Sequence, residues 1–385
     1  DRSPSRGLGD VYKRQKKSFY ILALAALAVS CTNDELTTNE TNAVVGFHAL
    51  TSGVTTRAVN ETNSVNLKDS PFDVYAFTET DGKLFIGKSL SESDYELSQG
   101  VEIRHNGSAW DYANPADKAY WPTDKKLNFF AFHPQPDPSG GYSVEVFSAS
   151  KQVVRYSVPT NAKFQKDLMY AISRGVDKNT NAGKVKILFK HALSQACFKA
   201  KTEKESMRVD VEDIQIHNIA VDGDLTLPQT GTDISMKDWD TQEKKHIAFE
   251  PKNLETPIME IGTEAKELTG KMYLPQELTK WTPENPETKT IDQANKEKQS
   301  YLSVLCKIKQ NGVYLWGSEE KAWRLFVPFG VKWEPGKRYV YTLIFGGGYK
   351  DDGTQALDQI KWEVEEMPWQ DAPYDVNADT NVNVN

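Results

Sequence analysis

The sequence has few of the residues that build catalytic or metal-binding centres. Its 385 residues include three cysteines, and no pair or cluster of them has the spacing of a zinc site. Six histidines are scattered along the chain, and none forms the His-Glu-x-x-His motif of a metalloprotease. A GxSxG nucleophile elbow, a Walker loop and a dinucleotide-binding fingerprint are also absent. We therefore expect neither an enzyme nor a metal or cofactor site.

Basic patches and long apolar runs are missing too. The formal net charge is −8, and residues 1–30 carry six basic and two acidic side chains, which leaves −12 for the chain from Cys31 onward. An acidic chain without a basic stripe is a poor nucleic-acid binder, so we expect no nucleic-acid partner. The apolar run Phe19–Val29 is too short to span a bilayer, and no stretch after Cys31 is long enough.

The N-terminal region has the pattern of a processed leader. Residues 1–15 resemble a translated sequencing adapter that replaces the natural start, a natural basic leader being the alternative. Residues 16–30 read as a signal peptide, with two lysines, an apolar run and small residues before Cys31. Because residues 27–31 resemble a bacterial lipobox, we expect cleavage before Cys31 and lipidation of that residue with acyl chains such as palmitate. An ordinary secretory peptide ending near a cysteine is the alternative.

The other two cysteines, Cys197 and Cys306, lie inside strand-like runs. We interpret them as buried thiols that act as small hydrophobic residues. A disulfide between them stays open, because an oxidising compartment permits one but the sequence does not establish their proximity.

Short stretches of alternating polarity recur along the chain, separated by turn signals such as Asn106-Gly107. In the stretch PFDVYAF, the apolar residues Phe72, Val74 and Ala76 fall on one face of a predicted strand. The stretch LNFFAFHP, residues 127–134, is apolar on both faces, which is typical of a central strand. Since no stretch shows a long helical period, the pattern predicts an all-β sandwich.

Two further stretches predict register and orientation. In VDVEDIQIHNI, residues 209–219, the apolar phase slips by one residue, which predicts a bulge or a tight bend. In IKWEVEE, the residues Ile360, Trp362 and Val364 are expected to point inward.

Polar stretches indicate how the chain is organised. The run Ser173–Lys184 is the best internal domain boundary, and Trp281–Ser300 reads as a long surface loop of the second domain. Nine tryptophans are spread along the chain. Core packing is their ordinary role, and stacking on sugars is the alternative.

The segment VTTRAVN, residues 54–60, is the sharpest candidate for a functional site. It is an extended stretch of small residues with a trypsin-like bond between Arg57 and Ala58. The preceding stretch Val44–Leu50 alternates like a strand, so proteolytic cleavage after Arg57 would sever that strand from its domain. The alternative is an exposed arginine in a loop.

Over residues 44–371 the chain resembles the fimbrillin-like lipoproteins of Bacteroidetes, which build type V pili. The resemblance rests on the order of several motifs: AYWPTDKKLNFFAFHP (119–134), DLMYA (167–171), FKHALSQACFK (189–199), MYLPQ (272–276), PFGVKWEPGKRYVYTLIF (328–345) and IKWEVEEMPW (360–369). The acidic TNDE after Cys31 also resembles the stretch that sends some Bacteroidetes lipoproteins to the outer face of the outer membrane.

The resemblance implies two tandem transthyretin-like β-sandwich domains and a pilus subunit. It implies a lipid anchor on Cys31 in the outer membrane, proteolytic processing near Arg57, and a first domain that then accepts a strand from a neighbouring subunit. Implied partners are other fimbrillin subunits and ligands on host or bacterial surfaces, and the implied location after processing is the fimbrium. The expected organisation is an adapter at 1–15, a signal peptide at 16–30, an anchored propeptide at 31–57, sandwiches at 58–178 and 184–372, and a tail at 373–385.

The C-terminus departs from the family pattern, because residues 370–385 offer only a short, weak strand to donate. A truncated gene, a different donor element and a tip subunit that accepts without donating all stay open. Two alternative functions also remain: a surface-anchored glycan-binding lipoprotein, and an anchor subunit that is never processed.

Overall fold

The computed structural model describes residues 43–51, 62, 66–89, 98–159, 164–241, 246–247, 256–346, 350, 352–354 and 360–369. The chain divides into two units, Asp1–Ala43 and Val44–Asn385, and all the described strands belong to the second unit. Among the predicted features, Cys31, Arg57, Ala58 and the C-terminal tail lie outside the described residues.

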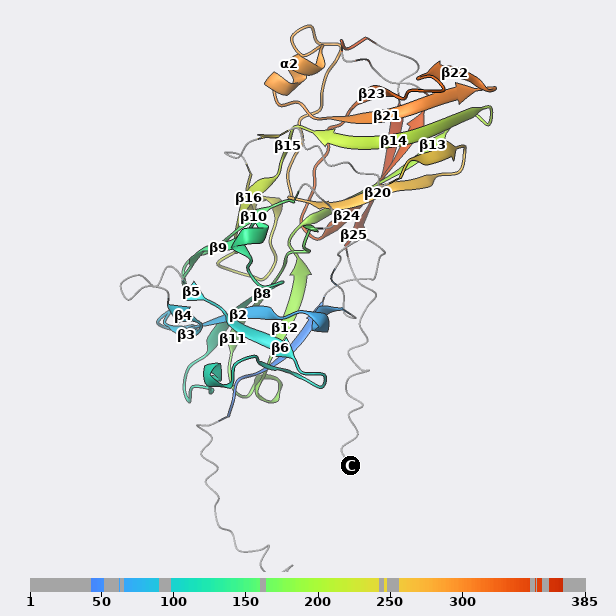
Figure 1. Ribbon diagram of the computed structural model, residues 1–385. Coiled ribbons are helices and arrows are strands. Elements are labelled where there is room, and N and C mark those ends of the chain that lie inside the picture. The colour runs from blue at the N-terminus through green and yellow to red at the C-terminus, as the bar shows by residue number, and fades with distance from the viewer. Residues whose placement is uncertain are drawn as a thin grey trace, which may run out of the picture. The chain divides into compact units, whose positions relative to one another are not determined.

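Strands make up most of the described structure, which confirms the all-β fold class (Figure 1). The earlier strands are β1 (Gly46–Thr51), β2 (Phe72–Thr78), β3 (Leu84–Ile86), β4 (Lys88–Ser89), β5 (Ser98–Gln99), β6 (Val101–His105), β7 (Trp110–Tyr112), β8 (Leu127–His133), β9 (Tyr142–Phe147), β10 (Gln152–Ser157), β11 (Met169–Val176) and β12 (Lys184–His191). The later strands are β13 (Ser194–Thr202), β14 (Met207–His217), β15 (Ile219–Ala220), β16 (Asp222–Thr226), β17 (Trp239–Asp240), β18 (His246–Ile247), β19 (Ile258–Ile261), β20 (Lys266–Tyr273), β21 (Tyr301–Gln310), β22 (Val313–Trp316), β23 (Trp323–Pro328), β24 (Lys337–Phe345) and β25 (Lys361–Pro368).

Helical segments are short. They are η2 (Leu67–Asp69), η3 (Pro115–Asp117), η4 (Pro138–Gly140), η6 (Thr180–Gly183), η7 (Met236–Asp238) and α2 (Ile291–Lys296). Within the described residues, no helix has the length and apolar character needed to cross a membrane.

The first sheet, in the order β3-β2-β6-β7-β1-β12-β11-β8, closes on itself because β2 also pairs with β8. Phe72, Val74 and Ala76 of β2 share one apolar cluster, which confirms the predicted face. The opposite face of β2 is buried as well, since Tyr75 packs on Phe147 of β9 with ring centroids 3.9 Å apart. β8 lies between β2 and β11 and is buried on both faces, as its apolar sequence predicts.

The polar run Ser173–Lys184 is a connection inside this sheet and does not separate two sheets. It joins β11 to β12, which pair antiparallel, and its turn places Asn181 and Ala182 in the left-handed region. Because the chain reverses here, the polar composition reflects a turn. β12 therefore belongs to the first sheet, although the predicted range 184–372 assigns it to the second domain. The division into two sandwich domains stays a prediction.

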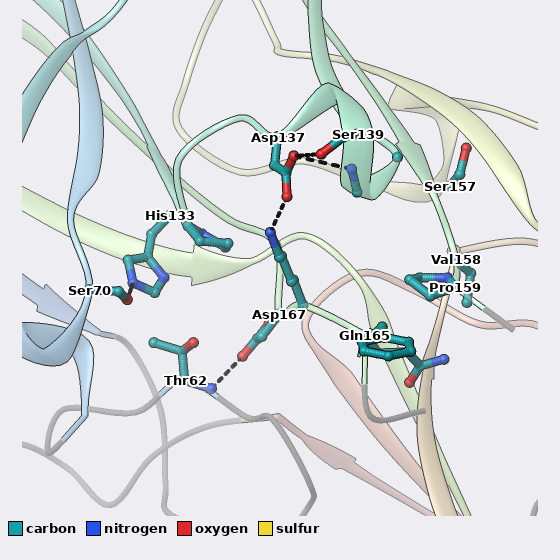
Figure 2. A pocket seen from close by; sticks show the side chains of 15 residues that line it. Thr62, Ser70, His133, Asp137, Ser139, Ser157, Val158, Pro159, Gln165 and Asp167 are labelled. Carbon is teal, nitrogen blue, oxygen red and sulfur yellow. Dashed lines mark hydrogen bonds and ion pairs between the residues drawn. The ribbon is translucent and has the colours of Figure 1, made fainter. Parts of the chain in front are cut away.

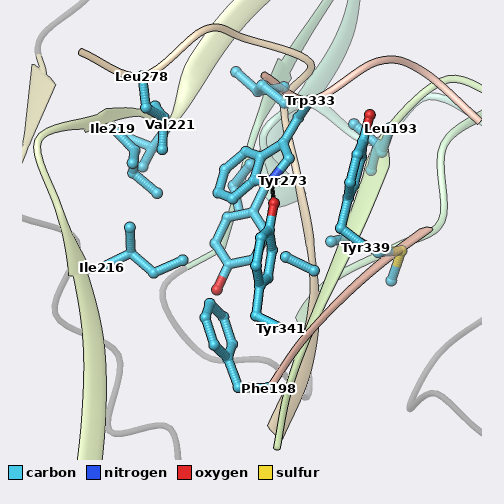
Figure 3. Packing of buried hydrophobic residues seen from close by; sticks show 14 of the residues in the cluster. Leu193, Phe198, Ile216, Ile219, Val221, Tyr273, Leu278, Trp333, Tyr339 and Tyr341 are labelled. Carbon is cyan, nitrogen blue, oxygen red and sulfur yellow. Dashed lines mark hydrogen bonds between the residues drawn. The ribbon is translucent and has the colours of Figure 1, made fainter. Parts of the chain in front are cut away.

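The later strands form two further large sheets, β20-β13-β24-β25 and β19-β14-β21-β22, with β23 on β21. Their apolar faces meet around Trp333, which stacks on Tyr273 at 4.9 Å and donates a hydrogen bond from Nε1 to the Tyr341 hydroxyl at 2.8 Å (Figure 3). The predicted phase slip in β14 is confirmed as a register shift between Val211 and Asp213.

Two predictions, one of side-chain orientation and one of a surface loop, are wrong in part. Ile360 is buried, but Val364 is 46% exposed, because β25 is an edge strand with little packed on its outer part. The stretch Trp281–Ser300 is not simply a surface loop, since it contains α2 and buries Trp281, whose ring packs against Tyr301. Both outcomes depend on tertiary packing: Val364 lacks a covering element, and Trp281 gains Tyr301 as a partner.

Cys197 and Cys306 are buried thiols that are not joined in a disulfide. Burial raises the pKa of the Cys306 thiol well above its usual range, which suits a small hydrophobic residue rather than a reactive one.

Candidate functional site

The N-terminal strand β1 is inserted into the first sheet. It runs parallel to β12 along its whole length, from Gly46 opposite Lys184 to Thr51 opposite Phe189. On its other edge, the described pairing with β7 is antiparallel and consists of Phe47 opposite Trp110. β1 is therefore held mainly by one neighbour.

The side chains of β1 alternate between the core and the surface, as the sequence predicts. Val45, Phe47, Ala49 and Thr51 are buried, and the residues between them are partly exposed. This alternation places every second side chain beneath the sheet. Burying a side chain as large as Val or Phe contributes about 1.5–3 kcal/mol, so the segment is part of the core and not a loose leader.

The surface that receives β1 is apolar and complementary. Phe47 contacts two aromatic rings edge-on, with centroids 5.5 Å from Tyr112 and 6.5 Å from Phe129. The facing side chains of β12 share its cluster. We call this surface the strand seat; its residues are Tyr112, Phe129, Val185, Ile187 and Phe189.

Hydrogen bonds hold the entrance of the seat. The Val45 N–H donates to the Ala119 carbonyl at 2.9 Å, and Trp121 Nε1 donates to the Gly183 carbonyl at 3.0 Å. Ala119 is the first residue of the motif AYWP, and Gly183 directly precedes β12. The motif therefore helps to position β1 beside β12. No sequence pattern connects residues 119–121 with residue 45, because the contact is between residues far apart in the chain.

The next described residue after β1 is Thr62, and it is also anchored. Its N–H donates to Asp167 Oδ2 at 2.9 Å. The predicted processing residues Arg57 and Ala58 are in the connecting segment, outside the described residues. The chain is thus fixed before and after that segment.

Asp167 belongs to a buried polar group that sequence analysis missed. Its Oδ1 accepts a hydrogen bond from His191 Nδ1 at 3.0 Å, and both side chains are almost fully buried. The His191 ring stacks on Trp369, with centroids 4.0 Å apart and planes 4° apart. Since His191 ends β12, this group connects the strand beside the seat with Thr62 and with Trp369. A charged residue opening the apolar stretch DLMYA was the one sequence signal for it.

The histidines do not assemble into a metal site. His133 is hydrogen-bonded through Nε2 to Ser70 Oγ at 2.7 Å, and burial lowers its pKa to about 4, although nearby Asp167 acts in the opposite direction. Among the described residues, no three His, Cys, Asp or Glu side chains are grouped to hold an ion. The contacts of the strand seat with β1 are apolar packing and backbone pairing.

Comparison with known proteins identifies the family of the chain. The sequence profile of the family described as fimbrillin-like matches residues 56–369. A fimbrial protein from Bacteroides vulgatus has a similar structure, with a TM-score of 0.57 and 14% identity over 86% of this chain and 100% of that chain.

Two other solved structures are more distant. A putative cell adhesion protein from Bacteroides uniformis has a TM-score of 0.42 and 14% identity over 85% of this chain and 98% of that one. The tip fimbrial protein Mfa3 from Porphyromonas gingivalis has a TM-score of 0.35 and 10% identity over 84% and 99%. The comparison with curated proteins found no match. Because the family profile covers most of its length, the chain belongs to the fimbrillin-like family.

Proposed function

We propose that the chain is a pilus subunit that is exported as a lipoprotein, processed after Arg57 and assembled by donor-strand exchange to support adhesion. The observation that carries the proposal is the place of β1, a core strand that precedes the predicted processing bond. One cut would make it a separate piece held only by non-covalent contacts. Family membership supports the same class of function.

The physical logic of exchange follows from the seat. Loss of β1 would expose the seat's apolar side chains to water and leave the β1-facing backbone groups of β12 without their strand partners. Both changes are unfavourable, so the vacant seat would bind any strand of suitable alternation. A strand from a neighbouring subunit would restore the pairing by β-augmentation.

The proposal includes the surroundings of the molecule. Lipid on Cys31 would hold the precursor in the outer membrane, exposed at the cell surface, and the processed form would become part of a fimbrium. Its partners would be other fimbrillin subunits. We keep two transthyretin-like sandwiches as the proposed domain organisation, with the boundary moved beyond His191 because β12 pairs within the first sheet.

A second candidate function is an anchor subunit that is not processed. It is favoured by one observation: β1 already completes the closed sheet, so the uncut chain needs no partner to fill the seat. Such a subunit would keep its lipid and offer other surfaces to the pilus. A glycan-binding lipoprotein would likewise keep Cys31 attached.

The N-terminus and lipid state of the protein on intact cells test the proposal. We expect mass spectrometry of surface-shed material to show a start at Ala58, with high-mass ladders on gels. An Arg57→Ala variant should abolish both, and an Arg104→Ala variant is the control, because it changes an exposed arginine on β6 and leaves the processing bond intact. A start at acylated Cys31 with no shorter form would overturn processing and leave the anchor subunit.

A further inference from the structure

A cavity of about 720 Å³ opens beside η4, and its lining includes no residue of the strand seat, although His133 in its wall contacts Phe189 of the seat with ring centroids 5.9 Å apart. The lining residues that matter for binding include His133, Asp137, Ser139, Phe164, Lys166 and Asp167. Figure 2 shows Asp137 and Ser139, His133 and Ser70, and Val158 and Pro159 around the same space. Its volume falls within the roughly 300–1,000 Å³ of small-molecule sites.

One ion pair supplies polar groups at the rim. Lys166 Nζ lies 2.8 Å from Asp137 Oδ2, and Ser139 Oγ donates to Asp137 Oδ1 at 2.6 Å. Hydrogen bonds from Lys166, Ser139 and the Gly140 N–H lower the pKa of Asp137 to about 2. Both side chains stay partly exposed, at 40% for Lys166 and 37% for Asp137. The pair is therefore ionised, neutral in sum, and still accessible for further hydrogen bonds.

The deeper polar groups are hydrogen-bonded or uncharged, and His133 Nδ1 is buried without a hydrogen-bond partner. The Gln165 amide bonds the backbone of Met272 through both its oxygen and its nitrogen. The Asp167 carboxylate accepts from Thr62 and His191, and His133 is neutral at physiological pH because burial lowers its pKa to about 4. Among the described residues of the inner wall, the one carboxylate, Asp167, is therefore already hydrogen-bonded.

The remaining wall is apolar and includes one exposed ring. Phe164 is 68% exposed, which is unusual for phenylalanine in a folded chain. Pro134, Val158 and Pro159 add apolar surface. An exposed aromatic ring next to an accessible carboxylate and ammonium suits a ligand that is apolar on one face and rich in hydroxyls at its edge.

We propose that this cavity binds a neutral saccharide, as a terminal residue or short segment of a glycan. The C–H face of the sugar ring stacks on Phe164, and neighbouring hydroxyls donate to Asp137 and accept from Lys166. An anionic sugar would have to compete with Asp137 for Lys166, so neutrality is part of the proposal. Its lining does not include β1, so it does not rest on strand exchange.

Saturation-transfer difference NMR on the full chain tests the proposal directly. The probes are the methyl glycosides of galactose, mannose and N-acetylglucosamine, with N-acetylneuraminic acid as the charged comparison. We expect saturation transfer to at least one neutral glycoside. Phe164→Ala and Lys166→Met should each weaken its binding about tenfold, since one stacking contact or one charge-assisted bond has that value.

The matched control is Trp323→Ala, because Trp323 is 45% exposed but lies on β23, outside the cavity lining. It should leave binding unchanged. Thermal unfolding of each variant confirms that the fold is kept. The proposal is overturned by transfer to none of the neutral glycosides, by preference for the charged sugar, by binding that is unchanged in Phe164→Ala, or by binding that is lost in Trp323→Ala. Ladder formation in Phe164→Ala cells reports on strand exchange separately.

Discussion

The fold contains two parallel strand pairings, and their surroundings differ. β24 runs parallel to β13 and is also paired along its length with β25, from Lys337 opposite Pro368 to Ile344 opposite Lys361. β1 runs parallel to β12 but meets β7 at a single described register position. Both strands fill apolar cores, so burial alone does not separate them. We therefore expect the ease of strand exchange to depend on how many edges of a strand are paired.

The largest expected effect is a difference in exchange. After limited trypsin cleavage at Arg57, a labelled peptide of residues Val44–Thr51 should enter the chain and raise fluorescence anisotropy. A Lys337–Phe345 peptide should not enter, because β24 is paired on both edges and stays covalently attached. The same Val44–Thr51 peptide carrying Phe47→Asp is the matched control and should fail. Equal uptake of both wild-type peptides would remove the distinction between β1 and β24.

The next effect is on the stability of the uncut chain. Phe47→Ala should lower the free energy of unfolding by about 3–5 kcal/mol, because it removes a ring packed on Tyr112 and Phe129. Leu50→Ala, in the same strand but only partly buried, should have a clearly smaller effect. Urea denaturation measures both. Equal losses would mean that the strand seat does not discriminate between the two faces of β1.

A pH titration compares the first sheet, through His133 of β8, with the later sheets, through His217 of β14. Burial lowers the pKa of His133 and of His217 to about 4, so the unfolded chain takes up protons first as pH falls. Stability is complete above the unfolded value near 6.5 and should fall by about 3 kcal/mol per histidine between pH 6.5 and 4. His133→Gln and His217→Gln should each remove the contribution of one histidine to this loss of stability. Urea denaturation at several pH values measures the free energy of unfolding of both variants. A pH profile unchanged in both variants would contradict this assignment.

The smallest effect concerns the anchor after β1. Asp167→Asn should cost about 1.5–3 kcal/mol, because the charged acceptor for Thr62 and His191 is lost. Hydrogen exchange at the Thr62 amide should increase in this variant. Asp240→Asn, an exposed position, is the control. Unchanged protection at Thr62 would show that Asp167 does not hold the segment.

Local patterns predicted the strands but not their neighbours. The shared face of Phe72, Val74 and Ala76 follows from a period of two, and the bulge in β14 from a slipped phase. The closure of the first sheet and the membership of β12 depend on pairings between residues far apart in sequence. Val364 was expected inside because alternation gives a face but not what covers it.

The candidate sites differ in the same respect: the alternation within one strand was predictable, and the surfaces built from distant residues were not. Val45, Phe47 and Ala49 were predicted to alternate before the Arg57 bond, and the structure places all three in the core. The seat itself was not predictable, because its walls come from residues 112, 129 and 185–189. The cavity had no sequence signal either, since Asp137 and Lys166 meet only after the chain has folded.

The parallel alignment of β1 with β12 has a mechanical consequence. A strand bonded sideways along its whole length, when pulled along its own axis, loads every hydrogen bond of the ladder at once in shear. Pulled sideways from one end, the same ladder would peel open bond by bond. A strand in this seat would therefore resist tension along the sheet far better than force across it.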